Sequence, residues 1–142
     1  MDKQVMERLK HVVDGIDEKT TDSECLRILD RRGRACTPRK LISRAKEIFD
    51  KAQTLEMFLS EFSEAFEFLH IEDGEVTVVY PRCFCYHITD VPPEDVPDEY
   101  CECSRSWLQE LFEQATGQSV EVAVLDSVVR GGKDCRFSVD FP

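Results

Sequence analysis

Residues 54–80, TLEMFLSEFSEAFEFLHIEDGEVTVVY, decide the fold because the spacing of their hydrophobic residues changes partway along. At first the apolar residues recur every three or four positions, which predicts a helix, capped by Thr54, with one apolar face: Leu55, Phe58, Leu59, Phe62, Phe66 and Leu69. Asp73-Gly74 then readily adopts the positive φ angles of a tight hairpin turn, and residues 76–80 predict a strand. We expect the phenylalanine-rich face to be central to the core, although such a face could also line a ligand cavity.

Before this stretch, the sequence predicts three more helices. The first carries apolar residues at helical spacing, namely Val5, Leu9, Val12, Val13 and Ile16. The second begins at the capping-box pattern of Thr21 and Glu24, whose side chains can satisfy free backbone N–H groups, and is expected to stop at Gly33. The third opens at Thr37-Pro38, and its apolar stripe is Leu41, Ala45, Ile48, Phe49 and Ala52.

After residue 80, the sequence predicts strands around one more helix. A strand over residues 82–88 is followed by an acidic, proline-containing loop over 89–100, and a helix then starts at Ser104 or Ser106 and ends at Gly117. Strands over 119–129 and 134–141 form a second hairpin through Gly131-Gly132. The prediction is therefore an α+β fold, with an N-terminal helical layer packed on a small antiparallel sheet that one helix interrupts. We expect one domain over residues 1–142, with the helical layer in 1–70 and the sheet, helix and cysteine pairs in 71–142.

Charge excludes some classes of partner. The 18 basic and 29 acidic residues give a net charge of 18 − 29 = −11, so we expect binding to neither nucleic acid nor anionic membranes, which require positive potential. No apolar run approaches the roughly 20 residues of a membrane helix, and the first residues lack the pattern of a secretory signal. We therefore expect a cytoplasmic protein. The basic cluster at residues 31–34 is interpreted as a solvated helix end, although it could pair with an acidic ligand.

The seven cysteines are unusual for a protein without an export signal. Cys83 and Cys85 form one short pair and Cys101 and Cys103 form another, so four thiolates could hold a tetrahedral zinc ion. Residues two apart on a straight strand lie about 6.6 Å apart, so each pair can chelate only where the backbone bends. The alternatives are buried thiols without a function, or a redox or nucleophilic role.

Three other residues, and the position of Cys103, bear on these alternatives. His87 shares a strand face with the first cysteine pair and is a spare candidate ligand. Cys103 lies close to a helix start, where the dipole lowers the pKa of a thiol and favours the thiolate for metal binding or nucleophilic attack. Cys135 alternates with apolar residues and has a second interpretation as a small core residue. Cys36 is expected in a loop that could approach the same region.

The last forty residues resemble the 4-vinyl reductase domain. The matching stretches are YCECSRSWLQELFEQATGQSVEVAVLDS at 100–127 and VVRGGKDCRFSV at 128–139. The resemblance implies the ligand-binding fold shared with trafficking-particle subunits and nitric-oxide-type sensor domains. It also implies small-molecule binding beneath a helical layer, often with dimerisation through helices. The helical first half is similar to bacterial proteins of this group, including relatives labelled as thiazoline-carboxylate hydrolases.

Some aromatic-sensing regulators with this domain hold zinc through cysteines, and the resemblance assigns this role by position. Cys135 matches the hairpin cysteine of the pattern, and Cys101 or Cys103 matches a cysteine ahead of the helix. Ser127 stands where the zinc-binding relatives place another cysteine, so their full ligand set is absent. Cys83 and Cys85 could supply the missing ligands, which is an inference beyond the family pattern.

Three functions follow as hypotheses. The leading one is a small-molecule-binding or sensing domain with a structural zinc ion and a mostly apolar pocket between the helical layer and the sheet. The second is a hydrolase that uses a cysteine nucleophile or a metal-bound water, with His87 as the nearest acid–base partner for a thiol. The third is an interaction module that forms a homodimer through its helices. The sequence identifies neither the ligand nor any catalytic residue.

Overall fold

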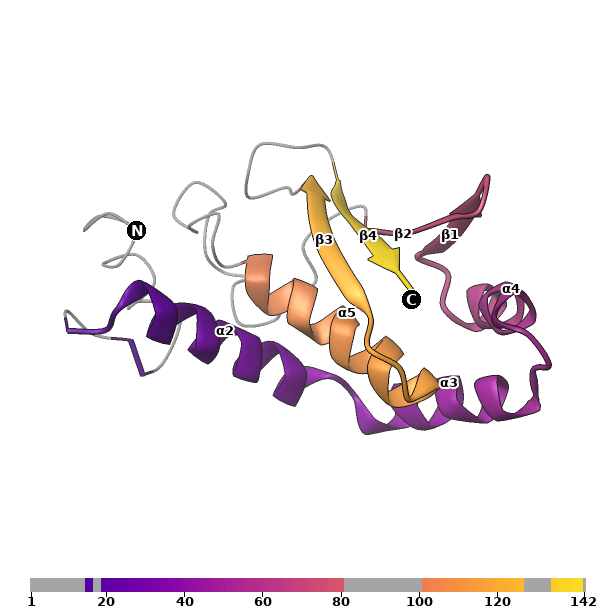
Figure 1. Ribbon diagram of the computed structural model, residues 1–142, viewed down its shortest axis with the longest axis horizontal. Coiled ribbons are helices and arrows are strands. Elements are labelled where there is room, and N and C mark those ends of the chain that lie inside the picture. Colours follow the sequence, from indigo (N-terminus) through magenta and orange to yellow (C-terminus); the bar gives the residue numbers. More distant parts are fainter. Residues whose placement is uncertain (1–14, 17–18, 81–100, 127–133, 142) are drawn as a thin grey trace.

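The computed structural model describes residues 15–16, 19–80, 101–126 and 134–141, and Figure 1 shows how their helices and strands are arranged. The helices are α2 (Asp22–Cys36), α3 (Arg39–Lys51), α4 (Leu55–Ala65) and α5 (Cys101–Thr116). The strands are β1 (Leu69–Glu72), β2 (Glu75–Tyr80), β3 (Glu121–Asp126) and β4 (Cys135–Asp140). This architecture confirms the predicted α+β class, with helices first and a sheet that α5 interrupts in sequence.

The sheet is antiparallel throughout and has the strand order β1-β2-β4-β3. Asp73 and Gly74 join β1 to β2 with φ angles of 52° and 79°, as the sequence predicts for a tight hairpin. Each hairpin contributes one central strand, so that β2 and β4 pair in the middle. Buried residues alternate with exposed or half-buried ones along β2 and β4, which places one face of the sheet on the core.

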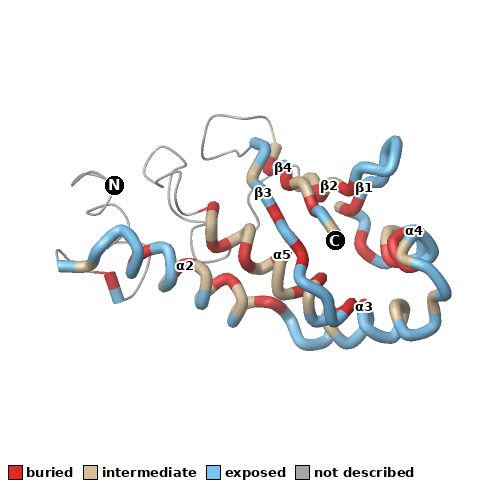
Figure 2. The backbone as a smooth tube through the Cα atoms, in the orientation of Figure 1, coloured by how far each residue is buried: buried red, intermediate tan, exposed pale blue. Residues whose placement is uncertain are grey.

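Helix α5 lies between the sheet and the outer helices α2 and α3 (Figure 1). Figure 2 shows buried positions along the whole of α5, whereas α3 is mostly exposed. The largest side chains with essentially no exposure are four phenylalanines: Phe58, Phe62, Phe112 and Phe137. Phe62 stacks on Phe58 at 5.6 Å and meets Phe112 edge-on at 6.1 Å between ring centroids. The prediction that the phenylalanine-rich face is central to the core is confirmed, but the helix is shorter than predicted: α4 ends at Ala65, so Phe66 is its C-cap and Leu69 begins β1.

Two predicted helix starts are confirmed by their hydrogen bonds. The hydroxyl of Thr21 accepts from the backbone N–H of Glu24 at 3.2 Å, and the carboxylate of Glu24 accepts from the backbone N–H of Thr21 at 3.4 Å. The hydroxyl of Thr54 accepts from the backbone N–H of Met57 at 3.1 Å at the start of α4. These contacts satisfy backbone donors that have no partner within their own helix.

The predicted stop of α2 at Gly33 is wrong. The helix continues to Cys36, which is therefore a half-buried helical residue and not part of a loop. Gly33 is buried against α5, and a Cβ atom added to it would lie 2.0 Å from the carbonyl oxygen of Cys103. This glycine thus allows two helices to approach closely, whereas the sequence pattern suggested a helix end.

Helix α5 also begins earlier than predicted, at Cys101 and not at Ser104 or Ser106. Glu102 lies in its first turn, where the positive end of the helix dipole stabilises a carboxylate. Its carboxylate accepts a hydrogen bond from Arg105 at 2.6 Å. The helix ends at Thr116, before Gly117 with a φ of 70°, as predicted.

Several predicted segments lie outside the described residues. They are the first helix apart from its last apolar residue, the strand over 82–88, the loop over 89–100 and the glycine turn of the second hairpin. Within the described ranges, every helix is too short or too polar to cross a lipid bilayer.

Candidate functional site

The strongest candidate site is a groove bounded by α4, the β1–β2 hairpin, the end of β4 and Leu125 of β3. It has a volume of about 910 Å³. Its apolar lining comes from both layers and consists mainly of Leu55, Leu59, Ile71, Val76, Val139 and Phe141. Its polar lining consists of hydroxyl and carboxylate groups: Glu56, Ser60, Glu75, Thr77, Ser138 and Asp140. We call this feature the α4–sheet groove.

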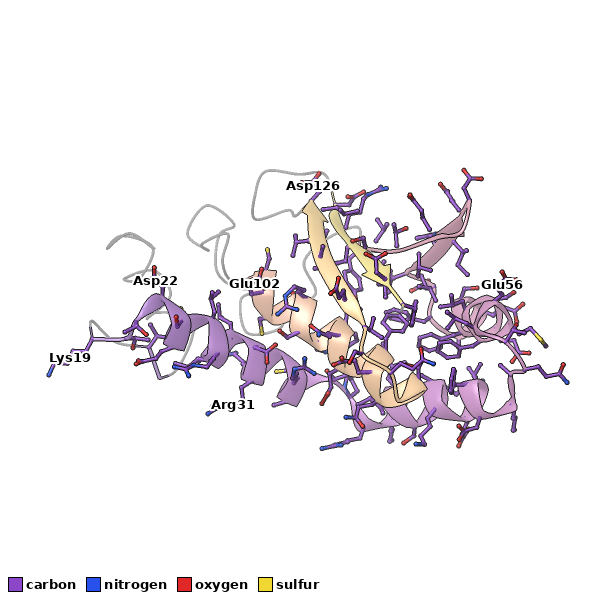
Figure 3. The ribbon with its side chains drawn as sticks, in the orientation of Figure 1. Lys19, Asp22, Arg31, Glu56, Glu102 and Asp126 are labelled. Atoms are coloured by element: carbon purple, nitrogen blue, oxygen red, sulfur yellow. The ribbon has the colours of Figure 1, made fainter. Side chains whose placement is uncertain are left out.

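Helical spacing explains the α4 side of this groove. Leu55 and Leu59 are four residues apart and form one row on the helix, and Glu56 and Ser60 form the neighbouring row. Figure 3 shows Glu56 on the side of α4 that lies toward the β1–β2 hairpin. The helix therefore presents an apolar row and a polar row side by side to the groove.

Strand register explains the apolar part of the sheet side. Ile71 pairs with Val76 across β1 and β2, and Val76 pairs with Val139 across β2 and β4. The three side chains thus form one continuous apolar row across three strands. Ile71 remains 41% exposed, so part of this row faces solvent at the groove.

The next position along each strand is acidic. Glu72 pairs with Glu75, and Glu121 pairs with Asp140. Because Val76 pairs with Val139, the register places Glu75 beside Asp140, so that all four carboxylates cross the sheet in one row. We call these four residues the acidic row. Like charges at directly opposed positions of a sheet lower its stability.

The acidic row and Glu56 form no ion pair within the parts of the chain that the structure describes. Arg105 lines a smaller hollow that also contains Glu121 and Asp140. Its guanidinium, however, pairs with Glu102 at 2.6 Å and lies 3.5 Å from Asp30. The carboxylates of the acidic row thus have no basic partner among the described residues, and along β2 and β4 they lie on the face of the sheet opposite the apolar row.

A second charged region, between α2 and α5, has a different character. Arg34 pairs with Asp30 at 3.2 Å, Glu110 at 3.3 Å and Glu113 at 3.0 Å. Burial acts to raise the pKa of Asp30, but the hydrogen bond from Ser106 and the charge of Arg34 outweigh it and hold that pKa below its ordinary value. These contacts join the two helices. Arg34, which was interpreted as part of a solvated cluster, is thus a half-buried structural residue.

The described cysteines of the predicted metal site lie on two elements. Cys101 and Cys103 are buried in the first turn of α5, and Cys135 is buried at the start of β4, opposite Tyr80. Residues two apart in an α-helix point about 200° apart, which opposes chelation of one ion by both Cys101 and Cys103. Within the described ranges, no three His, Cys, Asp or Glu side chains form a group that could hold a metal.

Other predicted site residues remain untested by the structure. Cys83, Cys85 and His87 lie outside the described residues, so the zinc site that includes them stays a prediction. Cys135 is buried among core residues, as its interpretation as a small core side chain requires, and its place among the zinc ligands stays a prediction. Burial, followed by the proximity of Cys135, raises the pKa of Tyr80 above its ordinary value. Proton transfer by Tyr80 near neutral pH is thus disfavoured.

Sequence reasoning missed the α4–sheet groove. A signal was present, because an acidic residue stands at the same end of each strand: Glu72, Glu75, Glu121 and Asp140. The two predicted hairpins were enough to suggest that Glu72 pairs with Glu75 and that Glu121 pairs with Asp140. Placing the pairs side by side required the pairing of β2 with β4, which are not consecutive strands.

Comparison with known proteins places the chain in a family. No curated protein matches this chain. A family model described as "Family of unknown function (DUF6144)" matches residues 3–140. With nearly its whole length covered by that model, the chain belongs to the DUF6144 family.

Proposed function

We propose that this protein is a small-molecule-binding domain whose ligand occupies the α4–sheet groove. The observation that carries the proposal is a groove lined by apolar side chains of both layers together with hydroxyl and carboxylate groups. Its volume of about 910 Å³ suits an organic molecule, because ligand pockets commonly have volumes of about 300–1,000 Å³.

Exposed apolar surface supports the proposal. Ile71 is 41% exposed and Leu125 is 55% exposed, and both line the groove. A ligand that covers them gains roughly 25 cal/mol per Å² of apolar area removed from water. The resemblance to the 4-vinyl reductase domain points to the same class of function, since it implies small-molecule binding beneath a helical layer.

A structural zinc ion is a separate part of the proposal. Three of its four ligands would come from Cys83, Cys85 and one of Cys101 and Cys103, because the helix directs the latter two apart, and Cys135 is the candidate for the fourth. Elemental analysis of protein purified without chelator tests this part. A zinc content below about a tenth of an equivalent would reject it without affecting the proposal for the groove.

Binding is favoured over hydrolysis at this groove. A cysteine hydrolase requires a thiol and a base that face the substrate. The described residues that line the groove include neither a cysteine nor a histidine. Helix-mediated dimerisation remains a prediction, since it was drawn partly from residues 5–16.

A fragment-library titration followed by NMR tests the proposal. Ligands should shift backbone amide signals of α4, β2 and β4 together, since these elements form the groove. The variant Ser60→Trp should abolish those shifts by filling the groove from an exposed position of α4. Its matched control is Glu61→Trp, an exposed neighbour that does not line the groove. Shifts that persist in Ser60→Trp would contradict the proposal.

A further inference from the structure

We propose that α2 is a hinged cover of α5. It opens as a unit while α3, α4, α5 and the sheet stay folded, and it thereby exposes Cys103. This inference goes beyond the proposed function and does not rest on it, because no residue of α2 lines the α4–sheet groove.

Helix α2 lies outside the main hydrophobic core of the described chain. Its fully buried apolar side chains, Cys25 and Leu29, do not belong to the cluster of buried residues that joins α3, α4, α5 and the sheet. Within the described ranges α2 packs mainly on α5, and Figure 1 shows it beside α5 on the side away from the sheet. Opening of α2 would therefore leave that cluster intact.

The interface that holds α2 on α5 is largely polar. Arg34 pairs with carboxylates of both helices, and the hydroxyl of Ser106 donates to Asp30 at 2.7 Å. The side chains of Arg34 and Asp30 are 31% and 39% exposed, so they remain partly hydrated and their ion pair contributes little free energy. Gly33 brings the two backbones close but adds no side chain to the interface. Such an interface opens at a lower cost in free energy than an apolar core.

The connection between α2 and α3 allows this motion. Only Thr37 and Pro38 join the two helices, and both are extended, with ψ angles of 122° and 129°. Proline has no backbone N–H, so the hydrogen bonds of a continuous helix cannot run through this connection. The hydroxyl of Thr37 lies 3.1 Å from the carbonyl oxygen of Trp107, which ties the connection to α5. Helix α2 can thus turn about these two residues without unwinding α3.

The face of α5 beneath α2 carries a thiol. Cys103 precedes Ser106 by three residues and Glu110 by seven, so the three share one helix face, and both later residues contact α2. A Cβ atom on Gly33 would lie 2.0 Å from the carbonyl oxygen of Cys103, so α2 lies directly on this turn. Cys103 is 5% exposed in the closed form. Opening of α2 would make its thiol accessible to a reagent.

Hydrogen exchange and thiol alkylation of the full chain test the inference, with mass spectrometry of peptides as the readout. Amides of α2 and the thiol of Cys103 should react through the same opening. Both should be at least about tenfold less protected than amides at the centre of β2 and β4. In low urea, exchange in β2 and β4 should rise more steeply than exchange in α2, because global unfolding exposes more surface than the opening of one helix.

Two variants should give different patterns. Val78→Ala removes buried methyl groups from a core that is intact in both the closed and the open form. It should speed exchange in β2 and β4 by about tenfold and leave α2 and Cys103 unchanged. Arg34→Met weakens the closed form, and should speed exchange in α2 and alkylation of Cys103 by about tenfold. The control Arg31→Met should change neither, since Figure 3 shows Arg31 on the side of α2 away from α5.

Three results would overturn the inference. If Val78→Ala speeds exchange in α2 by the same factor as in the sheet, α2 leaves α5 only when the whole molecule unfolds. If Arg34→Met speeds exchange in α2 but leaves the alkylation of Cys103 unchanged, the helix frays without uncovering α5. Should Val78→Ala fail to fold, the urea series on the wild type decides, and equal slopes for α2 and the sheet would reject a separate opening.

Discussion

The interface between α2 and α5 and the α4–sheet groove both contain several carboxylates. The carboxylates at the interface are paired with an arginine, whereas those around the groove are not. At the interface, Arg34 lies within 3.3 Å of three carboxylate oxygens, which belong to Asp30, Glu110 and Glu113. In the groove, Glu56, Glu75 and Asp140 have no such partner among the described residues. The net charge of −11 is therefore unevenly compensated.

The difference reflects what each region does. Charges between two packed helices lose much of their hydration, so each must find a partner within the fold. Charges around an open groove keep their hydration and can remain unpaired at a small cost to stability. The first arrangement joins two helices, and the second leaves several carboxylates without a basic partner among the described residues. Substitutions in the two regions should consequently have opposite effects on stability.

The largest effect should come from Gly33, where α2 and α5 lie closest. Gly33→Ala places a methyl group 2.0 Å from the carbonyl oxygen of Cys103, so the helices must separate. We expect a loss of about 2–3 kcal/mol in the free energy of unfolding, despite the higher helix propensity of alanine. Urea unfolding measures this change. Ala35→Leu, at an exposed position of the same helix, should change stability far less, and a neutral Gly33→Ala would refute the close packing.

Removing the central arginine should have the next largest effect. Arg34→Met keeps the aliphatic stem but leaves Asp30, Glu110 and Glu113 without their shared cation. Because the four side chains are only partly buried, we expect a loss of about 1–2 kcal/mol. Thermal and urea unfolding provide the measurement, with the exposed Arg31→Met as the matched control. Equal effects of the two variants would contradict the special role of Arg34.

The lowered pKa of Asp30 predicts how the stability of the α2–α5 interface depends on pH. Its pKa in the folded state lies below the ordinary value of 3.8, so its charged form is stabilised by folding. That contribution is present above pH 3.8 and is lost as the pH falls through the lowered pKa. Asp30→Asn should therefore destabilise the protein at neutral pH, and the difference from the wild type should shrink on acidification. A difference that grows as the pH falls would show the opposite sign of the shift.

The smallest effect should come from the acidic row, and it should have the opposite sign. Glu75→Gln removes repulsion with Glu72 and Asp140, so we expect a gain of roughly 0.5 kcal/mol in stability at low salt. The gain should fall as salt is added. Glu64→Gln on α4 is the control for the loss of one exposed charge. A destabilised Glu75→Gln would mean that Glu75 has a cationic partner in the folded protein.

Local signals made part of the fold predictable. The cap at Thr21, the phenylalanine spacing of α4 and the Asp73-Gly74 turn each depend on residues close together in sequence, and each is confirmed. Gly33 misled the prediction because a glycine looks the same at a helix end and at a helix crossing, and only the position of α5 distinguishes them. The groove was missed for a similar reason, since the acidic row depends on the pairing of β2 with β4.

The role of the cysteine pairs was the hardest feature to predict from the sequence. The Cys-x-Cys spacing is compatible with a metal site only for certain backbone shapes, and sequence alone did not reveal that the second pair is helical. Because Cys101 and Cys103 lie two residues apart on a helix, only one of them is expected to bind a zinc ion held by Cys83 and Cys85.

The strand order has a consequence for when the groove is completed during folding. Half of the acidic row belongs to the β1–β2 hairpin and half to the β3–β4 pair, which joins it only through β2 and β4. A chain that stops before Cys135 would carry Glu72 and Glu75 but lack both Asp140 and the apolar wall of β4. The groove is thus complete only when the whole sheet has formed. A ligand that binds there would stabilise the least local strand pairing of the molecule, and would report on how much of a preparation is fully folded.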